Sequence, residues 1–280
     1  DEVRVEMSES GVQLFARLEA RRSLKDIEPA LFPDDGGPDH GDVVELYGTE
    51  GTGKTELLYH LLCRCVLPQD AGGLEAEVAF VDTDYSLDMF RLVSILDGRL
   101  SSSAHLAGSG DSVLRSCLSR LLVLHCSSSS QLLLTLHSLE TSMALRPGLA
   151  LLLIDSISAF YWLDRCGGGA SVTKQEELLG KCAELLGRLL RDYRITIVAT
   201  CHAIRRTSCG PSSSSSSDPN RPYLCRLWQR LVTHRLLCSR QESTGDHVAH
   251  RQVFAVHCTS GKKSNRSSSF YVTDAGIMFI

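Results

Sequence analysis

The segment Gly48-Thr49-Glu50-Gly51-Thr52-Gly53-Lys54-Thr55 constrains the fold of this chain more than any other. It fits the pattern G-x-x-x-x-G-K-[ST] without a mismatch, follows the apolar run 43–47 and opens the helix-like run 54–65. A strand before the loop and a helix after it are the context in which this pattern marks a phosphate-binding loop. Glycines let the backbone wrap the phosphates, and a helix N-terminus favours negative charge. We therefore expect residues 48–55 to bind the phosphates of a nucleotide.

Two side chains of this loop and one distant carboxylate form the expected metal side of the site. Lys54 is expected to contact the β- and γ-phosphates, and the Thr55 hydroxyl to bind Mg²⁺. The apolar run 149–154 ends in Asp155, which supplies a carboxylate at the end of a strand. Two strand–helix units separate Lys54 from Asp155, and this separation favours an ASCE-type NTPase over a small-molecule kinase.

Hydrophobic periodicity predicts an α/β fold in which strands and helices alternate. Short apolar runs predict strands at 43–47, 78–81, 121–124, 149–154 and 195–198, and helices lie between them. Five such runs predict a largely parallel central sheet with both faces covered. From Leu231 onward the strands 231–238, 252–259, 270–272 and 276–279 follow without helices, which predicts an antiparallel C-terminal extension. Stretches 101–110 and 167–169 read as loops.

Charge and composition divide the chain unequally. Residues 1–200 carry 18 Lys+Arg against 29 Asp+Glu, whereas residues 201–280 carry 11 against 4. We predict an acidic lead-in segment at 1–40 and one ATPase core at 41–280. Within the core, 205–221 contains six consecutive serines and is expected to be a disordered loop. No apolar run reaches the ~20 residues of a membrane helix, and 11 Cys without Cys-x-x-Cys pairs indicate a reduced, intracellular protein.

Several further stretches resemble the RecA-type recombinases, specifically the eukaryotic recombinase paralogues. These stretches are Gly41-Asp42-Val43-Val44-Glu45, Phe80-Val81-Asp82-Thr83-Asp84, Leu153-Ile154-Asp155-Ser156 and Val198-Ala199-Thr200. The resemblance spans residues 8–280 in order. It implies a RecA-like P-loop NTPase core with ATP and Mg²⁺ as cofactors. It also implies that Arg91 lies at a position that stacks on adenine in this family.

The departures from the family pattern bear on catalysis. The family's catalytic Glu aligns with Asp84, whose carboxylate falls about 1.5 Å back, and misplacement on that scale can cost ~10²-fold in rate. The usual sensor Gln aligns with His202. A basic position in the first DNA-contact loop aligns with Gly168, and the second such loop is the serine run. The family's Phe-x-x-Ala docking segment is missing. Asp84 and His202 are therefore weak catalytic candidates.

The resemblance implies an ATP-binding, weakly or non-hydrolysing subunit of a heteromeric paralogue complex. Such a complex, including paralogue D, assists homologous-recombination repair of double-strand breaks and crosslinks in the nucleus. Single-stranded or branched DNA would be contacted through the complex. The alternative, an autonomous DNA-dependent ATPase that acts on DNA strands, stays open. The stretch with Arg226, Trp228, Arg230 and Arg235 is expected to contact either nucleic acid or a neighbouring subunit.

Overall fold

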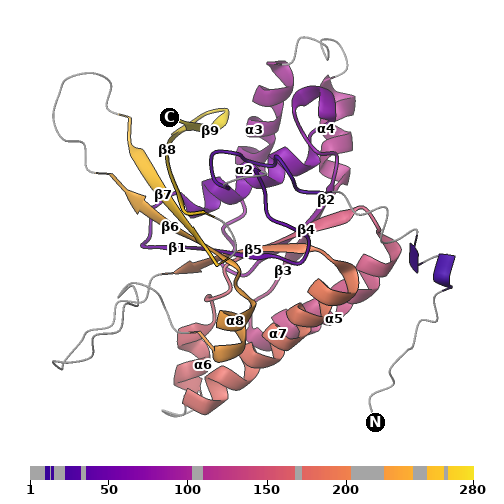
Figure 1. Ribbon diagram of the computed structural model, residues 1–280, viewed down its shortest axis with the longest axis vertical. Coiled ribbons are helices and arrows are strands. Elements are labelled where there is room, and N and C mark those ends of the chain that lie inside the picture. Colours follow the sequence, from indigo (N-terminus) through magenta and orange to yellow (C-terminus); the bar gives the residue numbers. More distant parts are fainter. Residues whose placement is uncertain are drawn as a thin grey trace.

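The computed structural model describes residues 10–12, 14–15, 23–32, 36–102, 110–167, 172–202, 224–241, 251–261 and 264–280, and leaves the side chains of 165–167 and 172–175 aside. Its centre is a nine-stranded sheet with the order β3-β2-β4-β5-β1-β6-β7-β8-β9 (Figure 1). The parallel strands are β3 (Leu121–His125), β2 (Glu77–Asp82), β4 (Leu149–Asp155), β5 (Thr196–His202), β1 (Val43–Gly48) and β6 (His234–Arg240). The antiparallel strands are β7 (Val253–Ser260), β8 (Arg266–Thr273) and β9 (Gly276–Phe279).

Helices cover both faces of the parallel part of the sheet (Figure 1). One face carries α2 (Lys54–Val66), α3 (Met89–Ser101) and α4 (Gly110–Ser119). The other carries α5 (Ser129–Leu145), α6 (Tyr161–Gly167), α7 (Val172–Tyr193) and α8 (Arg226–Leu231). A short 3₁₀ turn, η1 (Gln69–Ala71), follows α2. The predicted α/β fold with a mostly parallel sheet is confirmed, and α4, α6 and α8 are helices that the periodicity did not predict.

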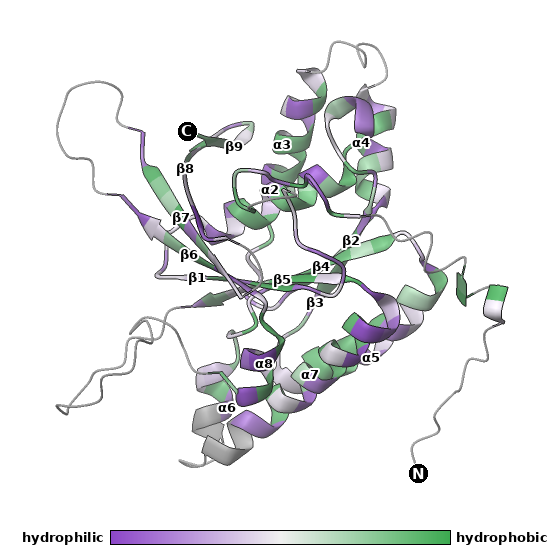
Figure 2. Ribbon diagram, viewed as in Figure 1, coloured by the Kyte–Doolittle hydropathy of each residue, from purple (hydrophilic) through white to green (hydrophobic). Residues whose placement is uncertain are grey.

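The strands at the centre of the sheet are largely apolar and buried because both of their faces are covered, and Glu45 of β1 and Asp155 of β4 are polar exceptions. All residues of β1 and β4 are buried, and Figure 2 shows hydrophobic colour along the central strands. Side chains alternate along β4: Leu151 and Leu153 pack toward α2, whereas Leu152 and Ile154 pack toward α5 and α7. A two-residue period therefore divides one continuous apolar run between two cores.

The prediction for residues 231–238 was wrong in part. Leu231 ends α8, and the strand β6 begins at His234 and pairs parallel with β1. The antiparallel extension starts one strand later, where β7 pairs with β6. The reason is α8, because a helix between β5 and β6 provides the crossover that a parallel strand needs.

The described part of the N-terminal segment packs on the core. Leu24, Ile27, Leu31 and Phe32 are each at most 2% exposed and join the cluster around α2. The segment is also held by hydrogen bonds, since the Arg64 guanidinium donates to the carbonyls of Asp26 and Ile27 at 2.9 Å each. The domain division at residue 41 stays a prediction, but residues 23–32 contribute apolar area to the same core.

A buried polar network fastens this segment to two helices. His60 Nε2 lies 2.5 Å from Glu28 Oε2, and the Arg99 guanidinium donates to His60 Nδ1 at 2.7 Å. Because Nδ1 accepts this bond, His60 is neutral and donates from Nε2 to Glu28. Burial lowers the pKa of His60, against the opposing effect of the Glu28 hydrogen bond. Burial raises the pKa of Glu28, but the contact with His60 outweighs it and the net shift is downward.

The substitution Phe32→Ala tests how much the N-terminal segment stabilises the core. Phe32 is 1% exposed, and removing a buried phenylalanine costs about 3–5 kcal/mol. We expect the free energy of unfolding in urea to fall by that amount. Phe90→Ala is the matched control, because Phe90 is 91% exposed and should change stability by less than about 0.5 kcal/mol. Equal losses in the two variants would contradict the packing described.

The free energy of unfolding should also depend on the protonation state of the His60 ring. Its folded pKa lies below the ordinary 6.5, so the unfolded chain binds this proton first and unfolding is favoured as pH falls below about 6.5. We expect His60→Gln to flatten the decline in unfolding free energy between pH 8 and pH 5.5. His40→Gln, at an exposed histidine, should leave the wild-type decline. An unchanged slope in His60→Gln would contradict the prediction.

Candidate nucleotide-binding site

The phosphate loop lies between β1 and α2 and turns on two glycines in the left-handed region. Gly51 has φ 68° and Gly53, the residue before α2, has φ 80°. A Cβ atom at Gly53 would lie 2.9 Å from Phe270 Cζ, whereas one at Gly51 would meet nothing within 4 Å. The loop therefore needs glycine at 51 for conformation alone and at 53 for both conformation and space.

Lys54 is the buried cation of this loop. Its ammonium donates to the carbonyls of Gly48 at 3.0 Å and Thr49 at 2.7 Å, and the residue is 7% exposed. Burial lowers its pKa, while the thiol of Cys238 and the carboxylate of Asp155 oppose that shift. The arrangement holds a positive charge against loop carbonyls at the N-terminus of α2, where phosphate oxygens are favoured.

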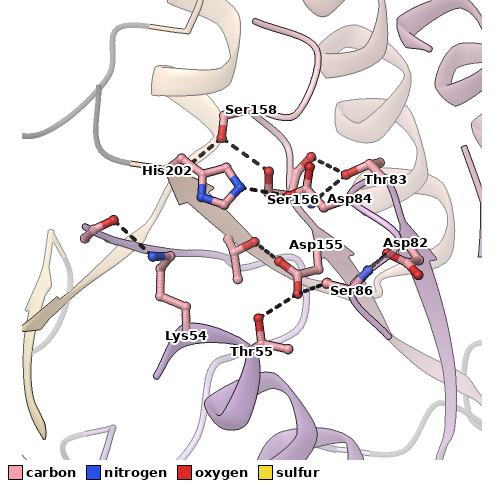
Figure 3. A network of polar contacts seen from close by, with 12 residues as sticks. Lys54, Thr55, Asp82, Thr83, Asp84, Ser86, Asp155, Ser156, Ser158 and His202 are labelled. Carbon is pink, nitrogen blue, oxygen red and sulfur yellow. Dashed lines mark hydrogen bonds and ion pairs between the residues drawn. The ribbon is translucent and has the colours of Figure 1, made fainter. Parts of the chain in front are cut away.

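Asp155 is the centre of the polar network in Figure 3. Its Oδ2 accepts from Thr55 Oγ1 at 3.0 Å and from Ser86 Oγ at 3.0 Å, and Thr200 Oγ1 donates to its Oδ1. The carboxylate is 3% exposed. Three hydroxyls, one from α2, one from the turn after β2 and one from β5, therefore fix both of its oxygens.

These contacts fit the expected magnesium side of a nucleotide site. Thr55 gives its hydroxyl proton to Asp155, which leaves the lone pairs of its oxygen for a cation. Mg²⁺ takes oxygen ligands and keeps several waters, commonly with one or two carboxylates nearby. Thr55 and Asp155 would hold the ion, which would supply charge neutralisation at the phosphates. No cluster of three or more His, Cys, Asp or Glu suited to a metal occurs among the residues that the structure describes.

The two weak catalytic candidates contact each other. His202 Nε2, at the end of β5, lies 2.8 Å from Asp84 Oδ2, just past the end of β2 (Figure 3). The backbone amide of His202 donates to Ser158 Oγ at 2.9 Å. His202 Nδ1 is buried and has no hydrogen-bond partner among the described residues. A buried ring nitrogen without a partner is consistent with a hydrogen bond to a ligand oxygen at the phosphate site.

Arg91 lies on α3 and is held in one plane by four contacts. Its guanidinium pairs with Glu56 of α2 through Nε at 3.1 Å and one NH2 group at 3.0 Å. It also donates to the carbonyls of Thr273 at 2.6 Å and Asp274 at 2.7 Å in the β8–β9 turn. Adenine contact at Arg91 stays a prediction. The fixed plane leaves the faces of the guanidinium as the surface that a ring could use.

The structure also reassigns one residue and leaves others untested. Trp228 was expected to contact nucleic acid or a subunit, but it is 1% exposed and donates from Nε1 to the buried Glu45 at 2.8 Å. It packs α8 onto β1 instead. Gly168 and the serine run 205–221 lie outside the described residues.

Three residues of the site were missed by the sequence analysis. Ser86 and Thr200 hold Asp155, and Ser158 holds the backbone of His202. Each lies within a few residues of the carboxyl end of a parallel strand, where such sites form. That position was the available signal, but isolated serines such as Ser86 and Ser158 are too common to single out, and Thr200 was noted only as part of a family-like stretch, without a role.

Comparison with known proteins agrees with this geometry. A family model described as Rad51 matches residues 30–278, so the chain belongs to the Rad51 family. It is 47% identical over 280 residues to the DNA repair protein XRCC2 of Mus musculus, covering 97% of each chain. An XRCC2 homologue of Arabidopsis thaliana is 25% identical over 255 residues, covering 70% of this chain and 68% of that protein. The DNA repair protein RAD51 of Saccharomyces cerevisiae is 27% identical over 209 residues, covering 72% and 46%.

The resemblance to recombinases and their paralogues is therefore confirmed at the level of the family. Within the described residues, no helix is long and apolar enough to span a membrane. All nine cysteines that the structure describes are free and buried.

The two loop glycines give a matched pair of substitutions. Gly51→Ala adds the cost of a left-handed alanine, about 1–2 kcal/mol. Gly53→Ala adds that cost and the contact with Phe270 at 2.9 Å. We expect Gly53→Ala to lower the free energy of unfolding more than Gly51→Ala and to weaken binding of an ATP analogue further. If Gly51→Ala were the more damaging change, the stated role of Phe270 would be wrong.

Proposed function

We propose that this chain is an ATP-binding, weakly hydrolysing subunit of a recombinase-paralogue complex. The complex assists homologous-recombination repair of DNA double-strand breaks and crosslinks. Membership of the Rad51 family and 47% identity to a DNA repair protein support the repair role. One observation supports weak hydrolysis. The carboxylate at the family's catalytic position belongs to the shorter Asp84, and His202 Nε2 lies 2.8 Å from its Oδ2.

Different residues of the site bind and orient different parts of ATP·Mg²⁺. Lys54 neutralises charge on the phosphates, and Thr55 with Asp155 holds Mg²⁺. His202 presents its second ring nitrogen to a phosphate oxygen while Asp84 holds the ring from the other side. Arg91 offers a planar cation to the adenine. A carboxylate committed to His202 is poorly placed to polarise an attacking water, so ATP acts chiefly as a bound ligand.

The partners and location follow from the same proposal. The chain works with other recombinase paralogues, including paralogue D, in the nucleus, and meets single-stranded or branched DNA through the complex. Residues 41–280 form one ATPase core, onto which residues 23–32 of the lead-in segment pack.

The substitution Lys54→Ala tests the nucleotide site and its use. Loss of a hydrogen-bonded charge costs about 1.5–3 kcal/mol, so we expect ATP affinity to fall ~10- to 100-fold. Lys181→Ala, at an exposed lysine of α7, is the control and should bind ATP as wild type does. Unchanged affinity in Lys54→Ala would refute the assigned site.

The same variant separates two uses of the nucleotide. Assembly with the paralogues and cell survival after crosslinking damage should be measured together. If both persist without ATP binding, the fold serves as a scaffold. If both fail, the nucleotide is a structural or switching ligand.

The substitution Asp84→Glu tests the cause of weak hydrolysis. The added methylene advances the carboxylate by about 1.5 Å, and we expect the rate of ATP hydrolysis to rise, by up to ~10²-fold when His202→Gln is added. Asp97→Glu, at an exposed position of α3, should change nothing. A wild-type kcat equal to that of a filament-forming recombinase would refute the proposal.

A further inference from the structure

The turn after β2 aims two side chains at the phosphate site. The buried carboxylate of Asp82 accepts from the backbone amides of Ser86 at 3.0 Å and Leu87 at 3.3 Å, which closes the turn. Asp84 and Ser86 both point inward from it, one to His202 and the other to Asp155 (Figure 3). The placement of Asp155 thus depends on the shape of this turn.

Tyr85 lies between these two inward-pointing residues and takes a conformation that is unfavourable for its type. Its φ is 54°, in the left-handed region, which only glycine, and sometimes Asn or Asp, adopts readily. Its side chain is turned outward and is 64% exposed. A strained, exposed aromatic residue next to a site calls for a stabilising contact.

That contact is His125 at the end of β3. The rings of Tyr85 and His125 are parallel within 6°, with centroids 5.5 Å apart. His125 Nδ1 in turn lies 3.4 Å from Asp82 Oδ2, the carboxylate that closes the turn. The ring stack with Tyr85 and the polar contact with Asp82 therefore place His125 against the outside of the turn.

We propose that Tyr85 and His125 are positioning residues for the magnesium side of the site. They hold the turn after β2, the turn holds Ser86, and Ser86 holds Asp155. The proposal rests on the proposed binding of ATP·Mg²⁺. It also makes β3, the outermost strand on that side of the described sheet, part of the support of the nucleotide site.

The neighbouring Phe90 provides the contrast. It is 91% exposed, lies five residues from Tyr85 on α3 and makes no ring contact within the described part of the chain. Exposure near the turn therefore does not by itself produce a ring contact of the kind that Tyr85 makes.

The experiment measures how binding of ATP to the full-length chain depends on Mg²⁺, by titration calorimetry, in four variants. Tyr85→Ala removes the ring but keeps a Cβ atom at positive φ, whereas Tyr85→Phe keeps the ring. His125→Ala removes the partner ring. Phe90→Ala is the control. Loss of an outer partner of a metal site typically costs ~10- to 100-fold in metal affinity. We expect Tyr85→Ala and His125→Ala to raise the half-saturating Mg²⁺ concentration about 10-fold. Tyr85→Phe and Phe90→Ala should stay within about twofold of wild type, inside the usual range for a neutral surface change.

Binding of ATP in the presence of EDTA separates positioning from general damage. It should stay near the wild-type value in every variant, because the phosphate loop is untouched, and thermal unfolding should confirm that each variant is folded. A Mg²⁺ dependence in Tyr85→Ala and His125→Ala equal to that of Phe90→Ala would overturn the inference while leaving ATP binding intact. Wild type that fails to bind ATP at all would refute the proposed function, and the inference with it.

Discussion

The carboxylate of Asp155 is the interaction on which the rest of the site depends. Four chain segments meet there: β4 supplies the carboxylate, and α2, the turn after β2 and β5 each supply a hydroxyl. A buried carboxylate is costly unless its oxygens are satisfied. The strand order β2-β4-β5-β1 brings these donors to one edge of the sheet. The site therefore depends on the fold, because the three hydroxyl donors meet at Asp155 only when the strands lie in this order.

The sequence was sufficient to predict what depends on long patterns. The apolar runs predicted every parallel strand from 43 to 198, and the loop 48–55 fixed the position of the site. Short helices such as α6 and α8 were missed, because six or seven residues do not show a 3.6-residue period. The parallel pairing of β6 could not be read from its residues. It follows from α8, whose anchor is the bond between Trp228 and Glu45, 183 residues apart.

Contacts between side chains that are distant in the sequence are a second feature that the sequence analysis could not predict. Asp84 and His202 were each singled out by alignment with a family pattern, but nothing in the sequence joined them. The same holds for His60 of α2, Arg99 of α3 and Glu28 of the N-terminal segment. Buried polar groups of this kind must be satisfied, yet many partners would satisfy them equally well. Partner choice is decided by backbone positions that only the folded chain defines.

Under the proposed function, the pairing of Asp84 with His202 accounts for a site that binds ATP but hydrolyses it slowly. In that proposal, binding of ATP·Mg²⁺ depends on Lys54 and on Thr55 with Asp155, and hydrogen bonds within the site hold each of these side chains. Hydrolysis needs in addition a carboxylate free to polarise water at the correct distance, because catalysis depends on contacts made in the transition state. Here that carboxylate is one methylene short and already bonded to a neighbour. We therefore propose that the site retains bound ATP longer than a hydrolysing site would, and that partners of the chain recognise its shape rather than its turnover.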